Sequence, residues 1–124
     1  MKITSILHAT FLSSNLERSR IFYEGLLGLS PSPARPDLGF PGVWYEVGAN
    51  QQIHLMLLPN PEAGLQRPPH GGRDRHVALA VSDLGELSRR LAEAEIAFTM
   101  SKSGRRALFC RDPDDNALEF IEAA

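Results

Sequence analysis

The chain has 124 residues, a size that suits one ordinary domain able to bury roughly two-thirds of the surface exposed by its unfolded form. Its 13 basic and 15 acidic residues are spread along the length and leave a formal charge of -2, which favours neither nucleic acid nor a membrane surface as a partner. No apolar stretch approaches the ~20 residues needed to cross a bilayer, no signal-peptide pattern is present, and the single cysteine, Cys110, excludes an intramolecular disulfide, so we expect a cytoplasmic protein.

The N-terminal part of the sequence predicts a strand followed by a helix. Residues 2–12 are rich in Ile, Leu, Phe and Thr, which is typical of a strand, and His8 lies within this run. Asn15 suits a helix N-cap and Gly28 suits the residue that ends a helix, with an apolar face at helical spacing between them. We therefore expect one helix from about residue 16 to residue 27.

Residues 29–58 predict a loop and a strand hairpin. Three prolines restrict residues 29–40 to a short strand at most, followed by a loop. Residues 42–48 and 52–58 have strand patterns and are separated by a tight connection, with Trp44 in the first strand and His54 in the second. Trp44 suits the wall of a pocket as well as a core position.

A stretch of different composition separates this half from the next. Residues 59–73 contain four prolines and three glycines with little apolar periodicity, which suits a linker. His70 lies in this stretch, beside Pro69 and Gly71, and is interpreted as a loop histidine without a ligand role.

The second half repeats the order of the first. A strand is predicted at 75–81, a helix capped by Asp83 follows, and three strands end at 117–121. The acidic turn at 112–116 lacks the spacing of a calcium-binding EF-hand loop and predicts a hairpin turn. The sequence therefore predicts an α+β fold made of two βαβββ modules in one chain, with module 1 at about 1–58, the linker at 59–73 and module 2 at about 74–124.

Residue types that bind divalent metals occupy matched positions of the two modules. His8 and His76 lie 68 positions apart, and His54 and Glu119 lie 65 positions apart. Each interrupts an otherwise apolar strand, where a polar side chain costs free energy unless it is hydrogen-bonded or ligated. Because the first and last strands of such a module can lie side by side, we expect His8 near His54 and His76 near Glu119. These four residues are the candidate metal ligands.

The donor types leave the metal open. Two imidazoles and one carboxylate suit iron(II), while three imidazoles and one carboxylate suit nickel, zinc, cobalt or manganese as well. Such an ion would act as a Lewis acid on two neighbouring oxygens of a substrate. The sequence has no Gly-x-Ser-x-Gly motif, phosphate loop or Gly-x-Gly-x-x-Gly motif, so a serine triad or a nucleotide site finds no support.

Two segments together with the paired modules carry a resemblance to a known family. One is the capped helix from Asn15 to Leu29, and the other is the ending Phe109-Cys110-Arg111-Asp112-Pro113-Asp114-Asp115-Asn116-Ala117-Leu118-Glu119-Phe120. They resemble the vicinal oxygen chelate superfamily, which includes glyoxalase I, extradiol dioxygenases, and fosfomycin and bleomycin resistance proteins. The resemblance covers nearly the whole chain and is specific for the fold rather than for the substrate.

The resemblance implies a divalent-metal-dependent lyase similar to glyoxalase I, acting on a small substrate through adjacent oxygens and an enediolate. His8, His76 and Glu119 match three of its ligands, while His54 stands where compact bacterial glyoxalase I has a glutamate that takes part in shuttling the substrate proton. His54 is therefore either a fourth ligand or the base, and Glu119 and His54 are the candidate catalytic residues. The substrate implied is a small molecule, such as a glutathione adduct.

Other functions remain open at this point. Ring-cleaving dioxygenases use two histidines and one glutamate on iron, which fits His8, His76 and Glu119. A thiol transferase of the fosfomycin-resistance kind, or a drug-binding protein of the bleomycin-resistance kind, are the further alternatives. Family members of this length commonly form homodimers that share the site between subunits, so a homodimer is expected, and the sequence does not decide whether the site forms within one chain or across two.

Overall fold

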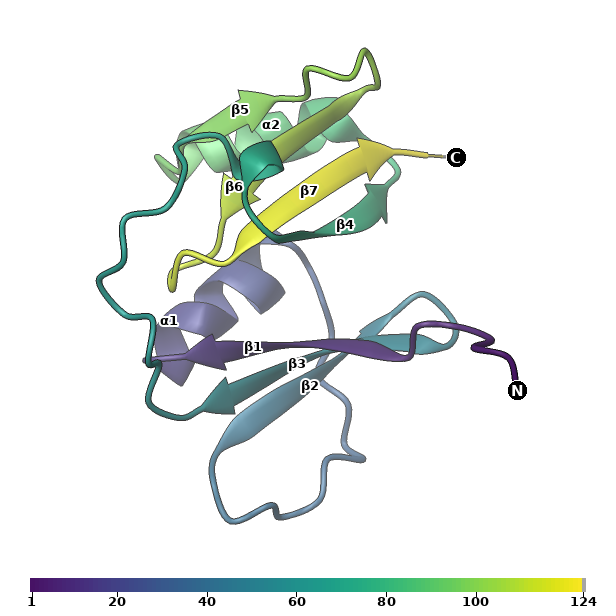
Figure 1. Ribbon diagram of the computed structural model, residues 1–124, viewed down its shortest axis with the longest axis vertical. Coiled ribbons are helices and arrows are strands. Elements are labelled where there is room, and N and C mark those ends of the chain that lie inside the picture. Colours follow the sequence, from purple (N-terminus) through teal and green to yellow (C-terminus); the bar gives the residue numbers. More distant parts are fainter. Residues whose placement is uncertain (124) are drawn as a thin grey trace. The chain divides into compact units, whose positions relative to one another are not determined.

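The computed structural model describes residues 1–123 and divides the chain into two compact units, Met1–Pro61 and Glu62–Ala124, called unit 1 and unit 2 below. Each unit holds its own sheet, with three strands in unit 1 and four in unit 2 (Figure 1). No helix in residues 1–123 is long and apolar enough to cross a bilayer.

Unit 1 has its strands in the order β1-β3-β2, with β1 parallel and β2 antiparallel to the central strand β3. A single bridge joins Pro31 to Tyr45 where the sequence predicted a further short strand. The hydrogen bonds of this bridge are made by the residues on either side of Pro31, since the N–H of Ser32 donates to the carbonyl of Trp44 and the carbonyl of Ser30 accepts from the N–H of Glu46. The bounds of the elements are β1 (His8–Ser13), α1 (Leu16–Arg20), η1 (Ile21–Leu26), β2 (Gly42–Val47) and β3 (Gln51–Leu57). The strand predicted at 2–12 therefore begins only at residue 8.

The helical segment of unit 1 differs from the single α-helix that was predicted. Asn15 caps α1 by accepting a hydrogen bond from the N–H of Arg18, but after Arg20 the chain continues as a π-helix. There the N–H of Leu27 donates to the carbonyl of Phe22, five residues earlier, and the segment ends before Gly28, whose φ is 74°. Phe22 and Tyr23 are both buried, and the ring of Tyr23 stacks on that of Tyr45 in the core.

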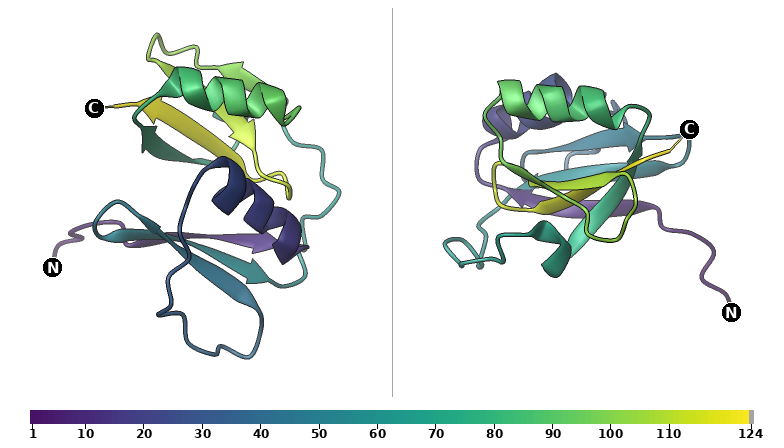
Figure 2. Two further views of the ribbon diagram at one scale, coloured as in Figure 1. Left: turned by 180° about the vertical axis from the view of Figure 1, so that it is seen from behind. Right: turned by 90° about the horizontal axis from the view of Figure 1, so that it is seen from above.

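Unit 2 has the strand order β4-β7-β6-β5, with β4 parallel to β7 and the other pairs antiparallel. Helix α2 lies across one face of this sheet (Figure 2) and buries Leu84, Leu87 and Leu91. Its N-terminus is capped by Asp83 and by Glu122, which accepts from the N–H of Leu84. The bounds are η2 (Gly71–Arg73), β4 (His76–Val81), α2 (Leu84–Glu93), β5 (Phe98–Met100), β6 (Ala107–Arg111) and β7 (Ala117–Glu122).

In both units a first strand is followed by a helical segment and then by further strands. The predicted α+β fold of two modules is therefore confirmed, with one strand fewer in unit 1 than predicted. The acidic stretch 112–116 forms the predicted turn between β6 and β7, because the buried side chain of Asp112 accepts hydrogen bonds from the N–H groups of Asp114 and Asn116. Cys110 on β6 is buried, and burial raises the pKa of its thiol to about 12. Cys110 is therefore a core residue, as the sequence indicated.

Candidate functional site

In unit 1, three aromatic rings stack on the face of the sheet opposite the buried side chains. His54 on β3 lies directly across from Trp44 on β2, with ring centroids 4.3 Å apart and planes 7° apart. The ring of His8 stacks on the other side of His54, at 4.0 Å and 13°. The next residues along the strands, Tyr45 beside Trp44 and Ile53 beside His54, point to the buried face of the sheet because strand side chains alternate.

The predicted proximity of His8 and His54 is therefore present, but the stacking limits what the pair does. A metal ion bound by an imidazole lies close to the plane of that ring, along the nitrogen lone pair. The planes of His8 and His54 are nearly parallel, so they do not meet at a common point beside the rings. In this arrangement the two imidazoles do not both bind one ion. The geometry favours one of them as a ligand and the other as a neighbouring group.

His54 is the more enclosed of the two histidines, with only 9% of its surface exposed, whereas His8 is exposed. Burial lowers the pKa of His54 below the ordinary imidazole value, and the charges of His8 and Arg35 lower it further. A neutral imidazole has one nitrogen with a free lone pair, so His54 suits the role of a base near neutral pH.

A pocket of about 630 Å³ opens beside this stack, and all of its lining residues belong to unit 1. His8, Trp44 and His54 contribute its aromatic wall, while Glu46, Asn50 and Gln52 contribute polar groups. Of the two positions that the sequence left open for Trp44, the structure therefore gives the pocket wall. A volume of this size accommodates a small organic molecule.

Unit 2 places His76 and Glu119 in positions equivalent to those of His8 and His54. Glu119 on β7 lies across from Ala78 on β4, two residues beyond His76, in the same way that His54 on β3 lies across from Thr10, two residues beyond His8. Because the registers match, the different offsets at the two ends of the repeat reflect a longer chain between the paired strands in unit 1 than in unit 2.

The imidazole of His76 and the carboxylate of Glu119 face each other at 3.5 Å, measured from Nε2 to Oε1. The Nδ1 atom of His76 lies 2.9 Å from the carbonyl oxygen of Asp74. A carbonyl only accepts hydrogen bonds, so Nδ1 carries the hydrogen and a neutral His76 presents the lone pair of Nε2 to Glu119. Two acceptors then face each other, and this arrangement requires a proton or a cation between them.

The separation of these two atoms fits a metal ion. Protein ligands bind zinc-like ions at about 2.0–2.2 Å, so two ligands of one ion stand roughly 3 Å apart. The hydrogen bond from Nδ1 of a ligating histidine to a backbone carbonyl is also the usual outer-shell contact that fixes its orientation. His76 and Glu119 are therefore spaced as two ligands of one divalent cation would be, although the described residues contain no group of three or more His, Cys, Asp or Glu side chains placed to hold a metal ion.

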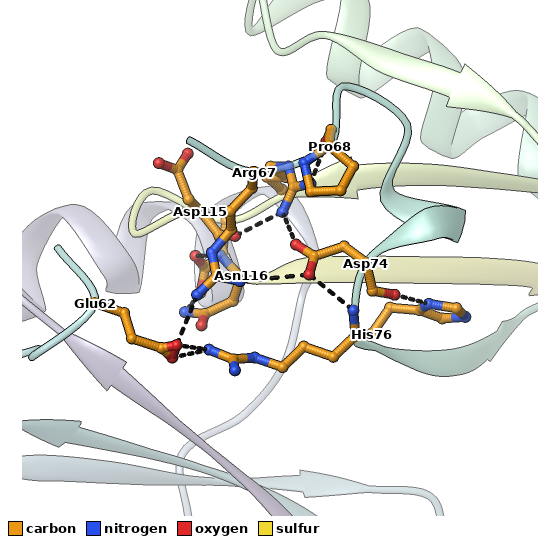
Figure 3. Close-up of polar contacts among 10 residues, drawn as sticks. Glu62, Arg67, Pro68, Asp74, His76, Asp115 and Asn116 are labelled. Atoms are coloured by element: carbon orange, nitrogen blue, oxygen red, sulfur yellow. Dashed lines mark hydrogen bonds and ion pairs between the residues drawn. The ribbon is translucent and has the colours of Figure 1, made fainter. Parts of the chain in front are cut away.

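The backbone that orients His76 is held by a cluster of ion pairs (Figure 3). The carboxylate of Asp74 accepts from Arg111 at 2.9 Å and from Arg67 at 3.4 Å, and Arg111 also donates to the carbonyl of Pro68 at 2.6 Å. Burial raises the pKa of Asp74, but the hydrogen bond from Arg111, the N–H of Arg75 and the nearby arginine charges outweigh it, so the pKa lies below its usual range. Asp74 is therefore ionised and anchored.

Sequence reasoning missed several residues that contact the candidate ligands. Arg105 donates to Oε2 of the buried Glu119 at 3.3 Å, and the edge of Phe109 packs against the ring of His76. In unit 1, Gln52 and Glu46 form a hydrogen-bonded chain that ends at His54. The strand patterns contained a signal for Gln52, because residues two apart on a strand share a face, but Arg105 lies in a turn where no periodicity applies.

His70 and two arginines, Arg35 and Arg75, have partners of their own. His70 lies 2.6 Å from Thr99 through Nδ1 and packs against Phe109, which leaves its interpretation as a loop histidine intact. Arg35 donates to the carbonyl of Phe40 and lies over the ring of that residue, and Arg75 pairs with Glu62.

Comparison with known proteins decides the family. The model of the Glyoxalase/Bleomycin resistance protein/Dioxygenase superfamily matches residues 5–120. The chain belongs to this superfamily. The match confirms the resemblance inferred from the sequence motifs.

Two relatives extend the comparison within the Glyoxalase/Bleomycin resistance protein/Dioxygenase superfamily. The chain is 27% identical to Glyoxylase I 4 of Arabidopsis thaliana over 96% of its own length and 71% of that protein. It is 30% identical to the uncharacterised protein YwkD of Bacillus subtilis, covering 98% of this chain and 99% of that one.

Solved structures of the superfamily share the fold. The structure of a glyoxalase family protein from Bacillus anthracis matches with a TM-score of 0.78 at 24% identity, and the match covers 100% of this chain and 98% of that chain. Lactoylglutathione lyase from Agrobacterium tumefaciens gives 0.67 at 19% identity, with coverages of 99% and 96%. The antibiotic binding protein TnmS3 from Streptomyces gives 0.70 at 20% identity, with coverages of 100% and 99%. An enzyme and a binding protein thus share this fold, so the fold alone does not identify the activity.

Proposed function

We propose that this chain is a divalent-metal-dependent enzyme of the glyoxalase I type, a lyase that acts on a small carbonyl compound or its adduct with glutathione. His8, His76 and Glu119 are the proposed ligands, and His54 is proposed to move the substrate proton. The observation that carries the proposal is the pair of facing acceptors on His76 and Glu119, 3.5 Å apart, in a position that unit 1 repeats with His8 and His54.

The stack in unit 1 supports a division of roles between its two histidines. His8 is exposed and its ring is the outer one, so it is free to turn toward an ion. His54 is enclosed between two rings and has a lowered pKa, which suits a base more than a ligand. The proposal therefore places His54 outside the ligand set, one of the two roles that the sequence left open.

The bound ion would supply Lewis-acid stabilisation of negative charge on two neighbouring substrate oxygens. His54 would take a proton from the carbon beside them and return it to the adjacent carbon, while Glu119 serves as a second group able to hold a proton. The pocket of about 630 Å³ beside the stack keeps the substrate against His54 and Trp44. Its polar lining by Glu46, Asn50 and Gln52 suits a substrate with hydrogen-bonding groups.

A second candidate function is ring-cleaving dioxygenation with iron(II). The observation that favours it is the donor set itself, since two histidines and one carboxylate form the usual ligand triad of non-haem iron oxygenases. With His54 outside the ligand set, the remaining three residues match that composition. A binding or resistance role is the outcome left if neither reaction occurs.

Metal analysis of the untagged protein, followed by two assays, tests the proposal. Wild type and a His70→Ala control should each hold about one divalent ion per chain, whereas His76→Ala should lose it. Equal metal content in wild type and His76→Ala contradicts the site. Protein loaded with nickel, zinc, cobalt or manganese is then assayed with methylglyoxal and glutathione, beside catechol with iron(II) under air. Activity in the second assay alone replaces the lyase by the dioxygenase, and metal binding without either activity favours a binding role.

A further inference from the structure

Three polar side chains of unit 1 form a hydrogen-bonded chain that ends at His54. Nε2 of Gln52 lies 3.1 Å from Oε1 of Glu46, and Oε1 of Gln52 lies 2.8 Å from Nε2 of His54. Glu46 and Gln52 are direct partners across β2 and β3, and Gln52 and His54 are two residues apart on β3, so the sheet itself places all three on one face. All three also line the pocket beside the ring stack.

The donor and acceptor types give this chain a direction. A carboxylate accepts hydrogen bonds only, so Gln52 presents its NH₂ group to Glu46 and its carbonyl oxygen to His54. A carbonyl also accepts only, so Nε2 of His54 carries the hydrogen. The reversed amide would set the Gln52 oxygen against the Glu46 carboxylate and leave two acceptors facing each other. In its neutral form, His54 therefore carries its lone pair on Nδ1.

The ring stack keeps the His54 imidazole in the orientation in which its Nε2 atom faces Gln52. Trp44 covers one face of the imidazole at 4.3 Å and His8 covers the other at 4.0 Å, so the ring has little room to tilt. His76 in unit 2 has the opposite arrangement, because its Nδ1 donates to the carbonyl of Asp74 and its Nε2 faces Glu119. The enclosed imidazole of His54 and the exposed imidazole of His76 therefore carry their hydrogens on different ring nitrogens.

We propose that Gln52 and Glu46 are positioning residues that hold His54 as the Nε2–H tautomer, so that Nδ1 is the atom that accepts the substrate proton. The tautomer follows from the hydrogen-bonded chain alone, whereas its use in proton transfer rests on the proposed function. In the transfer, the substrate C–H bond breaks, its electron pair moves onto the substrate carbon–oxygen unit, and the proton forms a bond to Nδ1. The Nε2–H of the resulting imidazolium still donates to Gln52, whose amide links it to the carboxylate of Glu46. Nδ1 then returns the proton to the adjacent substrate carbon, and no oxidant or further reactant is needed.

Nitrogen NMR of the histidine rings in the full chain tests the tautomer directly. At about pH 8, above the ordinary imidazole pKa of about 6.5, two-bond ¹H–¹⁵N spectra separate the protonated from the unprotonated ring nitrogen. The His54 signals are assigned by their loss in His54→Ala. We expect Nε2 to be protonated and Nδ1 to be unprotonated in wild type. A wild-type spectrum with the hydrogen on Nδ1 overturns the proposal.

Matched variants then test the role of the chain. Gln52→Leu should move both His54 nitrogen shifts toward averaged values, because nothing then selects one tautomer. The double variant Glu46→Gln with Gln52→Glu exchanges the amide and the carboxylate, and should restore the wild-type pattern because the residue at 52 again accepts from Nε2. Gln51→Leu on the same strand, whose side chain donates to the carbonyl of Ile6, should leave the shifts unchanged. Unaltered shifts in Gln52→Leu overturn the proposal.

Turnover of the metal-loaded enzyme separates this inference from the proposed function. Gln52→Leu should lower kcat by up to the ~10²–10⁴-fold contribution of a positioned base, with metal content unchanged, and the double variant should recover most of it. A Gln52→Leu enzyme with altered shifts but wild-type kcat overturns the positioning role. If wild type lacks the lyase activity altogether while its spectra show the Nε2–H tautomer, the proposed function fails and the tautomer assignment stands.

Discussion

His54 and Trp44 lie directly opposite each other on β3 and β2, with their rings 4.3 Å apart and nearly parallel. Trp44 is the only tryptophan in the chain. Its contact couples the enclosed imidazole to the wall of the pocket, so ring packing acts together with the hydrogen bond between Nε2 and Gln52 in setting the position of His54.

Replacement of His54 should separate metal binding from turnover. Because the ring planes of His8 and His54 do not converge, His54→Ala should keep the bound ion but lose about 10²–10⁴-fold in kcat, the usual contribution of a positioned base. Trp44→Phe, which retains an aromatic face, is the matched control and should lose much less. Metal analysis and steady-state kinetics on the same samples provide the measurement. Loss of metal from His54→Ala would return this residue to the ligand set.

Loss of the Asp74 carboxylate should affect both stability and metal affinity. Asp74→Ala leaves Arg111 and Arg67 without their shared partner, and hydrogen bonds to charged groups contribute about 1.5–3 kcal/mol each to the free energy of unfolding. Metal affinity should fall on the order of 10–100-fold, because the backbone carbonyl that orients His76 is no longer held in place. Denaturant unfolding and metal titration measure the two effects. Glu93→Ala, which removes an exposed ion pair with Arg89 on α2, should be much milder in both. Equal effects of the two substitutions would contradict the role given to Asp74.

The loss of folding stability at acid pH should depend on Glu122. The hydrogen bond from Arg106 and the N–H of Leu84 lower the pKa of Glu122 below its usual range. A carboxyl with a lowered folded-state pKa stabilises the fold at pH values above its unfolded pKa of about 4.3, and this contribution is lost as the pH falls through the folded-state value. Glu122→Gln should therefore be less stable than wild type near pH 7 and should lose less stability between about pH 5 and pH 3. Parallel curves for the two proteins would contradict the assignment.

The assembly is predicted to be a homodimer, as the short chain and its superfamily suggest. Light scattering at tens of micromolar should give twice the chain mass. If the ligands of one ion come from two copies, mixing His8→Ala chains with Glu119→Ala chains should restore part of the bound metal that each variant lacks. A strict monomer excludes the dimer, and in that case mixing should restore nothing.

The pairing of the candidate residues was accessible from the sequence because strand geometry is regular. Alternation and the internal repeat placed His8 beside His54 and His76 beside Glu119, and the parallel registers of both units agree with this. Ring orientation was not accessible, since it depends on rotamers fixed by neighbours such as Trp44. The proposed division of roles between His8 and His54 rests on this orientation.

Helix and strand details in unit 1 were harder to predict for a related reason. The apolar spacing from Leu16 to Leu27 fits an α-helix, but the burial of both Phe22 and Tyr23 accompanies a widened π-helical turn that a 3.6-residue period does not reveal. The short strand predicted near Pro31 is likewise only one bridge to β2, with its two hydrogen bonds made by Ser30 and Ser32.

Residues 62–73 form most of the stretch 59–73 that the composition predicted as a linker. They contribute ion pairs from Glu62 and Arg67 and the short helix η2 to unit 2. Unit 2 therefore begins earlier in the chain than the segment that repeats unit 1. Residues 62–73 are therefore an N-terminal brace of unit 2 that lies outside the repeated segments. Chimaeras between members of the superfamily should accordingly tolerate a crossover near Pro61, whereas a crossover near Asp74 would separate the brace from the strands that it supports.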